Sequence, residues 1–226
     1  MLVGKSMTSK VITIDKNESL FTAREVMRKN NIRHLPVVDG ENRPVGIVTD
    51  RDLRSAMPYR IYRNPDTAQA ESERIAKLKV SDIMTEDPMT IPLTYTLQDA
   101  LLLIQEKRFG AFPVVDDKGK LVGMISVRDL LRAFINVLGI GEPGTLLGIL
   151  VEEKVGQLKR IVDVITEENI SFGSVLVARY GEKGKRAVFP YLLTNNVIRV
   201  KKRLQEIGFK LIDPMEWYID QLNRDG

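Results

Sequence analysis

The sequence repeats itself at an offset of 77 residues, the distance from Met7 to Met84. Residues 7–53 align with residues 84–130 without a gap. Each half is too small to bury both faces of a sheet, so we expect the two halves to pack on one another. Identical residues recur at positions that decide local structure, including Met7/Met84, Thr13/Thr90, Leu20/Leu97, Ala23/Ala100, Pro36/Pro113, Val37/Val114, Asp39/Asp116, Gly46/Gly123 and Asp52/Asp129.

Each repeat predicts the order short strand, helix, strand, strand, helix. Ser19 and Thr96 can cap helices whose apolar residues recur at helical spacing. Strands are expected over residues 35–38 and 45–48, and over 112–115 and 122–125, with turn residues between the strands of each hairpin. A second helix begins directly at Thr49 or Ser126. The predicted fold class is α/β (α+β).

The segments "RHLPVVD…VGIVTDRDL" and "GAFPVVD…VGMISVRDL" resemble the CBS domain family, whose repeats pair into a Bateman module. The resemblance implies a regulatory protein that binds an adenine nucleotide or related adenosyl ligand: AMP, ADP, ATP or S-adenosylmethionine. It further implies a homodimer that signals allosterically to a regulated protein, which the sequence does not identify. A constitutive interaction scaffold with empty clefts is the alternative.

A hydroxyl and a carboxylate lie three residues apart at the start of each second helix, as Thr49 with Asp52 and Ser126 with Asp129. Such a carboxylate can accept hydrogen bonds from both hydroxyls of a sugar diol. The first helical N–H groups, with Arg51 or Arg128, can hold phosphate. In CBS proteins this Thr or Ser and this Asp contact ribose and phosphate. The same spacing is also that of a helix capping box.

The resemblance also places the adenine base. It would lie near Thr8, Ile12, Ile32 and Arg33 in the first repeat, and near Thr85, Met89, Phe109 and Gly110 in the second. Apolar walls with exposed backbone groups suit a flat purine. For the apolar members of both groups, packing in the core is the alternative. The second repeat has Val127 in place of Asp50, and the loss of that negative charge would favour phosphate there.

From residue 145 onward the pattern predicts a βαββαβ unit. The segment "VEEKVGQLKRIVDVITEENISFGSV" resembles the opening of an ACT domain. The resemblance implies a small-ligand site at Val155, Gly156 and Gln157, and an ordinary strand-to-helix turn is the alternative. A last helix is expected after Asp213 as its cap, with an apolar stripe of Met215, Tyr218, Ile219 and Leu222.

The whole arrangement is similar to AcuB-type proteins of acetoin utilisation. We interpret the chain as a first CBS repeat (1–57), a linker in which 68–79 is a possible helix (58–79), a second CBS repeat (80–138), a linker (139–144), an ACT-like ferredoxin-like domain (145–213) and a C-terminal helix (214–226).

Composition argues against an enzyme. Zero cysteines exclude thiol chemistry, and His34 is the single histidine, so we expect no catalytic residue, no metal and no required cofactor. The GxGxxG at residues 139–144 follows an expected helix and precedes a strand, the reverse of a dinucleotide-binding loop.

The charges do not indicate nucleic acid as a partner. A net charge of +4 is modest, and the basic residues alternate with acidic ones. The apolar runs are far shorter than the ~20 residues that span a bilayer, and the N-terminus carries no secretory signal. We therefore expect no membrane contact and a cytoplasmic location.

Overall fold

The computed structural model describes residues 1–57 and 73–222, in two compact units that comprise residues 1–131 and 132–226. The division falls after Leu131, inside the helix α6 (Val127–Leu138). Residues 73–77 are helical, while the rest of the possible linker helix, and residues 223–226 of the predicted C-terminal helix, lie outside the described residues.

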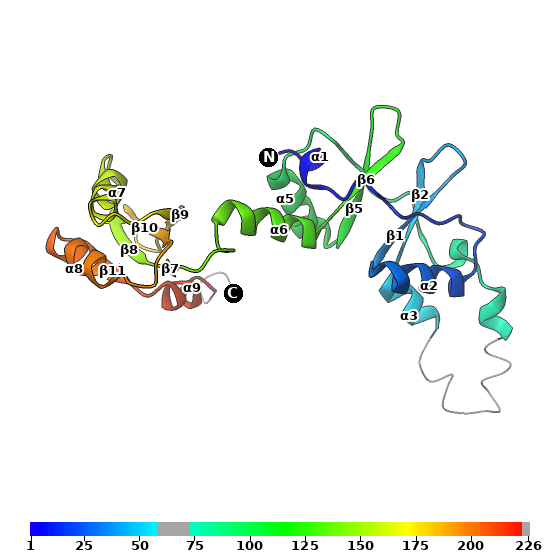
Figure 1. Cartoon of the computed structure of the whole chain (residues 1–226). Coiled ribbons are helices and arrows are strands. Elements are labelled where there is room, and N and C mark those ends of the chain that lie inside the picture. Colours follow the sequence, from blue (N-terminus) through cyan, green and yellow to red (C-terminus); the bar gives the residue numbers. More distant parts are fainter. Residues whose placement is uncertain (58–72, 223–226) are drawn as a thin grey trace, which may run out of the picture. The chain divides into compact units, whose positions relative to one another are not determined.

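The two repeats of the first unit have the predicted order of elements (Figure 1). Hairpins β1–β2 and β5–β6 are antiparallel, and a short strand before each first helix pairs in parallel with the hairpin. The first repeat comprises α2 (Leu20–Asn30), β1 (His34–Val38), β2 (Pro44–Thr49) and α3 (Asp50–Ala56). The second comprises β4 (Ile91–Pro92), α5 (Leu97–Lys107), β5 (Ala111–Val115), β6 (Leu121–Ser126) and α6 (Val127–Leu138).

Short polar side chains fix the element boundaries in both repeats. The Ser19 hydroxyl accepts a hydrogen bond from the Thr22 amide at 3.0 Å, which caps α2 as predicted. In the hairpin turns, Asp39 and Asp116 each accept two backbone N–H bonds. The amides of Arg43 and Lys120 respectively are the main reason that the pKa of each carboxyl lies below its ordinary value.

The N-terminal segment of each repeat packs on the other repeat. Strand β3 (Thr85–Glu86) pairs with β2, and at the equivalent place Thr8 bridges to Met124 of β6. We call residues 2–8 and 79–86 the swapped segments. They include the short helices α1 (Val3–Ser6) and η2 (Val80–Asp82), and Val80 is fully buried in the core of the first repeat. The residues that pack together as one domain are therefore not the same as the residues of one sequence repeat.

The second unit has the predicted βαββαβ order. Its main strands run β11-β8-β10-β9, which is the topology of a ferredoxin-like sheet, and the short strand β7 also pairs with β10. All of these pairs are antiparallel. Helix α8 begins at Ile198, later than the predicted Asn195 or Asn196. The elements are β7 (Thr145–Leu146), β8 (Gly148–Glu152), α7 (Gln157–Glu167), β9 (Phe172–Arg179), β10 (Lys185–Leu192), α8 (Ile198–Glu206), β11 (Lys210–Ile212) and α9 (Pro214–Leu222).

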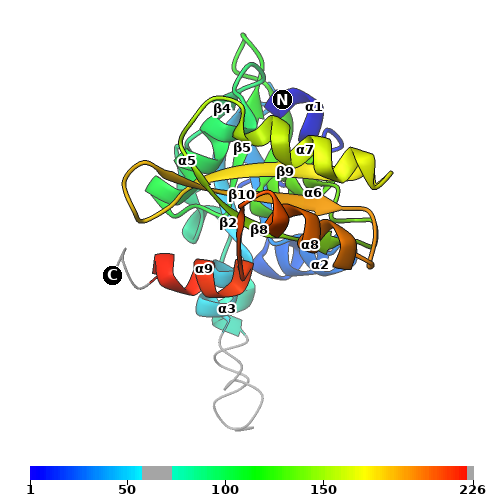
Figure 2. The same ribbon diagram turned by 90° about the vertical axis from the view of Figure 1, so that its left-hand side faces the viewer.

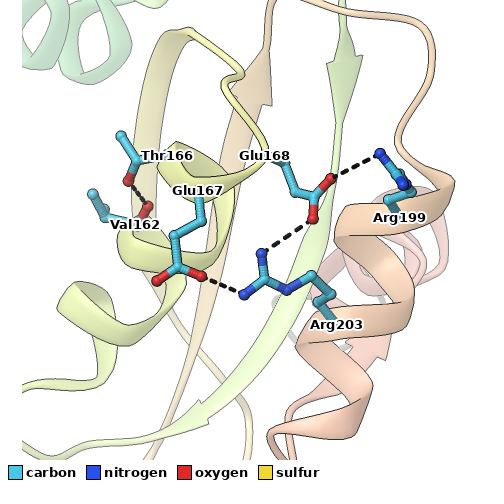
Figure 3. A network of polar contacts seen from close by, with 6 residues as sticks. All are labelled: Val162, Thr166, Glu167, Glu168, Arg199 and Arg203. Carbon is cyan, nitrogen blue, oxygen red and sulfur yellow. Dashed lines mark hydrogen bonds and ion pairs between the residues drawn. The ribbon is translucent and has the colours of Figure 1, made fainter.

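Helices α7 and α8 cover one face of this sheet (Figure 2). Their buried residues, such as Ile161 and Leu204, form one core with Ile149 and Val188 of the sheet. At the helix ends, Arg203 of α8 pairs with Glu167 and with Glu168, the latter at 3.1 Å (Figure 3). The pair with Glu167 is exposed and contributes little stability, whereas the pair with Glu168 is part-buried. Both join the end of α7 to α8.

Helix α9 corrects one sequence prediction. Asp213 caps it as expected, accepting bonds from the amides of Met215 and Glu216 at 2.7 and 3.1 Å. The predicted apolar stripe is wrong, because Met215, Tyr218 and Ile219 are exposed. Trp217 packs instead on Phe189, with ring centroids 4.8 Å apart. Phe189 alternates with Val188 along β10 and so points to the face opposite α7 and α8.

Across the described ranges, 1–57 and 73–222, no helix has both the length and the apolar character needed to cross a membrane.

Candidate functional site

The first unit contains a cavity of about 880 Å³ that both repeats line. The first repeat contributes β1, β2 and the start of α3, and the second contributes residues 85–89, the end of α5 and the start of β5. We call it the Asp52 cavity. Eight of the predicted nucleotide-binding residues line it: Arg33, Thr49, Arg51, Asp52, Thr85, Met89, Phe109 and Gly110.

Asp52 lies on this cavity as part of a complete capping box. Its Oδ2 accepts hydrogen bonds from the Thr49 amide and hydroxyl at 2.8 and 2.7 Å, and the Asp52 amide donates to the Thr49 hydroxyl at 3.3 Å. Within the described part of the chain, Oδ1 of Asp52 accepts no hydrogen bond. The helix cap therefore uses one carboxylate oxygen and leaves the other available.

Ser126 and Asp129 repeat this cap at the start of α6. Oδ2 of Asp129 accepts from the Ser126 amide and hydroxyl at 2.9 and 2.6 Å. The Thr8 hydroxyl donates to Oδ1 at 3.4 Å, and Asp129 is only 7% exposed. The second carboxylate is therefore engaged on both oxygens by the protein itself.

The structure divides the predicted first-repeat group of Thr8, Ile12, Ile32 and Arg33. Arg33 lines the Asp52 cavity, whereas Thr8 lies on Asp129. Ile12 and Ile32 pack against the core of the first repeat, as the alternative reading had it. The swapped segments are the reason, since they carry Thr8 and Thr85 each to the opposite repeat. Arg128 is exposed at the first turn of α6, next to the second cap.

The model of the CBS domain family matches residues 3–59 and again residues 80–136, just over half of the chain. The chain belongs to this family. The first unit is thus a tandem CBS pair, a Bateman module.

Relatives agree with this assignment. A CBS domain-containing protein of Dictyostelium discoideum is 37% identical over 138 residues, which are 61% of this chain and 94% of that protein. The crystal structure of a Vibrio cholerae protein assigned to acetoin utilization (AcuB) is 28% identical, with a TM-score of 0.52, over 62% of this chain and 96% of that one. CBSX2 from Arabidopsis thaliana is 29% identical, also with a TM-score of 0.52, over 59% and 94% of the two chains.

His34 also lines the cavity of the CBS pair. Its ring lies so close to Gly110 that a Cβ there would be 2.6 Å from Nε2, which explains the glycine at this contact between the repeats. Burial lowers the pKa of His34 and the positive charge of Arg33 lowers it further, against the opposing charge of Asp52. We therefore take His34 to be neutral near pH 7.

Charged side chains of both repeats also line the cavity, and of these the sequence motifs missed Arg54, Lys107, Arg108 and Asp87. The cations are Arg33, Arg51, Arg54, Lys107 and Arg108, and the carboxylates are Asp50, Asp52 and Asp87. Arg54 and Asp50 form an ion pair at 2.9 Å. Within the described ranges, no group of three or more acidic or histidine side chains is placed to hold a metal ion. Lys107 and Arg108 follow the apolar positions of α5, where nothing in the sequence points to a cavity.

The residues of the predicted second site lie in the loop between β8 and α7. Gly156 caps α7 with a φ of 93°, a conformation that favours glycine. Val155 before it is fully exposed, and Gln157 after it is the first residue of α7.

Proposed function

We propose that the CBS pair binds an adenine nucleotide or a related adenosyl ligand in the Asp52 cavity, and that occupancy regulates a partner protein. One observation carries the proposal. The cavity brings a carboxylate with an available oxygen, threonine hydroxyls, apolar side chains and cations to a single hollow large enough for a nucleotide.

Each part of an adenosine ligand has a counterpart in the cavity. Oδ1 of Asp52 can accept from the two ribose hydroxyls while Oδ2 keeps the cap of α3. Met89 and Phe109, 40% and 45% exposed, offer apolar surface to the base. The capping and ligand-binding interpretations of Thr49 and Asp52 are thus compatible, because they use different carboxylate oxygens.

A ligand in this cavity would touch both repeats, so its binding energy can change how the repeats are held together. We propose that a homodimer passes this change to the regulated protein, as in the family that the sequence resembles. The second unit would serve as an ACT-like sensor, with a small ligand at Val155, Gly156 and Gln157. The role is regulatory rather than catalytic, and the location cytoplasmic.

The test is calorimetric titration of the full chain with AMP, ADP, ATP and S-adenosylmethionine. A ligand present at ~100 times its Kd should stabilise the fold by about 2.7 kcal/mol. Asp52→Ala should weaken binding roughly 5- to 150-fold, because the ribose hydroxyls lose a charged acceptor.

Asp99→Ala is the matched control. Asp99 closes the same kind of capping box with Thr96 at the start of α5, but it does not line the cavity. Equal affinities for wild type and Asp52→Ala would reduce Asp52 to a helix cap. No binding of any of the four ligands to wild type would favour the scaffold with empty clefts.

A further inference from the structure

We infer that the Asp52 cavity selects phosphorylated adenosine ligands over uncharged or cationic adenosyl ones, with Arg51 and Arg108 as phosphate partners. The inference rests on the proposed function and narrows its ligand class. It separates AMP, ADP and ATP from S-adenosylmethionine, which the family resemblance left together.

Three of the cations lining the cavity have no partner among the residues that the structure describes. The side chains of Arg33, Arg51 and Arg108 form no ion pair or hydrogen bond with any residue that the structure describes. By contrast, Arg54 is paired with Asp50, and Lys107 with Glu106 at 2.6 Å. The two lining carboxylates outside these pairs, Asp52 and Asp87, do not balance the unpaired arginines. The hollow therefore presents uncompensated positive charge.

The backbone of Arg108 gives a second, independent argument. Arg108 ends α5 in the left-handed conformation, with a φ of 57°. The equivalent residue of the first repeat is Asn31, with a φ of 52°, and asparagine tolerates this conformation better than most residues do. An arginine here costs backbone energy, and within the described ranges its side chain forms no hydrogen bond or ion pair in return. A bound anion would supply the missing partner.

The cations at the end of α5 line this cavity, and the first repeat has no cations at the equivalent positions. The offset places Asn30 and Asn31 where the second repeat has Lys107 and Arg108. In the sequence motif alone, the acidic Asp50 suggested weaker phosphate binding in the first repeat than in the second. In the folded CBS pair, Arg54 neutralises Asp50, and the other repeat brings Arg108 to the same cavity.

Arginine is well matched to such a ligand, because its planar fork binds phosphate through two parallel hydrogen bonds. S-adenosylmethionine carries a sulfonium cation, which would approach like charges in the same hollow. Adenosine carries no charge and gains nothing from the arginines. Affinity should therefore follow the negative charge of the ligand.

The experiment compares AMP, ATP, adenosine and S-adenosylmethionine by calorimetry on the full chain. Only ligand binding that Asp52→Ala weakens is scored, so that the compared affinities refer to the Asp52 cavity. For wild type we expect AMP and ATP to bind at least about 10-fold more tightly than adenosine or S-adenosylmethionine. Arg108→Gln should weaken the affinity for AMP roughly 5- to 30-fold and leave the affinity for adenosine within about twofold, because only the phosphate loses a partner.

Lys118→Gln is the control, since Lys118 is an exposed cation in the β5–β6 turn and does not line the cavity. This substitution should change the affinity for neither AMP nor adenosine. S-adenosylmethionine or adenosine binding as tightly as AMP would overturn the inference and leave the proposed function standing. An equal loss of affinity for AMP and for adenosine in Arg108→Gln would show that Arg108 is not a phosphate partner. Failure of all four ligands to bind would defeat the proposed function itself.

Discussion

The two capping boxes of the CBS pair have the same bonds and different surroundings. Asp52 and Asp129 each hold the amide and the hydroxyl of the residue three positions earlier. Asp129 is buried and receives the Thr8 hydroxyl on its other oxygen, whereas Asp52 is partly exposed on a cavity with Oδ1 available. A duplicated motif thus does the same structural work twice, while its ligand chemistry depends on what the other repeat brings to it.

The largest effect should come from the glycines that receive the swapped segments. A Cβ at Gly123 would lie 2.1 Å from Sδ of Met7, and one at Gly46 would lie 2.5 Å from Sδ of Met84. Gly123→Ala should lower the free energy of unfolding by about 1–3 kcal/mol, and Gly46→Ala by slightly less, because a methionine must move in a packed interior. Urea unfolding measures both.

A double variant tests whether the close approach to Met7 causes the loss of stability in Gly123→Ala. If the clash with the methionine is responsible, Gly123→Ala should cost less stability in a Met7→Ala background than in wild type. Additive losses would show that the two residues do not press on one another, and the close fit of the swapped segment would be refuted.

The second comparison sets Asp129→Ala against Asp52→Ala. Both variants lose a helix cap, but Asp129 is the buried carboxylate of the two, and Asp129→Ala also leaves the Thr8 hydroxyl without its acceptor. We expect a loss of about 1–2 kcal/mol for Asp129→Ala and about 0.5–1 kcal/mol for Asp52→Ala, measured by urea unfolding without ligand. A larger loss for Asp52→Ala would reverse the contrast drawn between the two caps.

A smaller effect should separate Thr8 from Thr85, which occupy equivalent positions of the repeat. Thr8→Val removes the hydrogen bond to Asp129 and should cost about 0.5–1 kcal/mol of stability. The Thr85 hydroxyl lines the cavity, so Thr85→Val should leave the unliganded stability nearly unchanged and weaken nucleotide binding instead. Paired unfolding and titration curves decide this, and identical profiles for the two variants would contradict it.

The smallest effect is a pH dependence from His34. Its pKa in the folded protein is lowered by burial, so the unfolded chain binds the proton more readily. Stability should therefore fall as the pH drops below about 6.5, the ordinary pKa of histidine, and level off below the folded pKa. His34→Gln should remove this part of the slope below about pH 6.5. Because the chain has one histidine, an unchanged slope would exclude His34 as its source.

Much of the local structure could be predicted from the sequence, because its causes are local. Ser19 and Thr96 cap their helices, Asp39 and Asp116 shape their turns, and Asp213 begins α9. The face of α9 was predicted wrongly, since helical spacing shows which residues share a side but not which side meets the sheet. Trp217 is half-buried because it packs on Phe189 of β10.

The residues of the candidate site likewise divide into those that the sequence predicts and those that only the fold brings together. The duplicated "TDRDL" and "SVRDL" segments by themselves determine that a hydroxyl and a carboxylate meet at the start of each second helix, because residues three apart are neighbours in a first helical turn. Only the tertiary structure decided which side chains join them. The swapped segments take Thr8 to Asp129 and Thr85 to the Asp52 cavity, and the packing of the repeats brings Arg108 and Gly110 beside Asp52 and His34. Those contacts join residues far apart along the chain, and no local spacing encodes them.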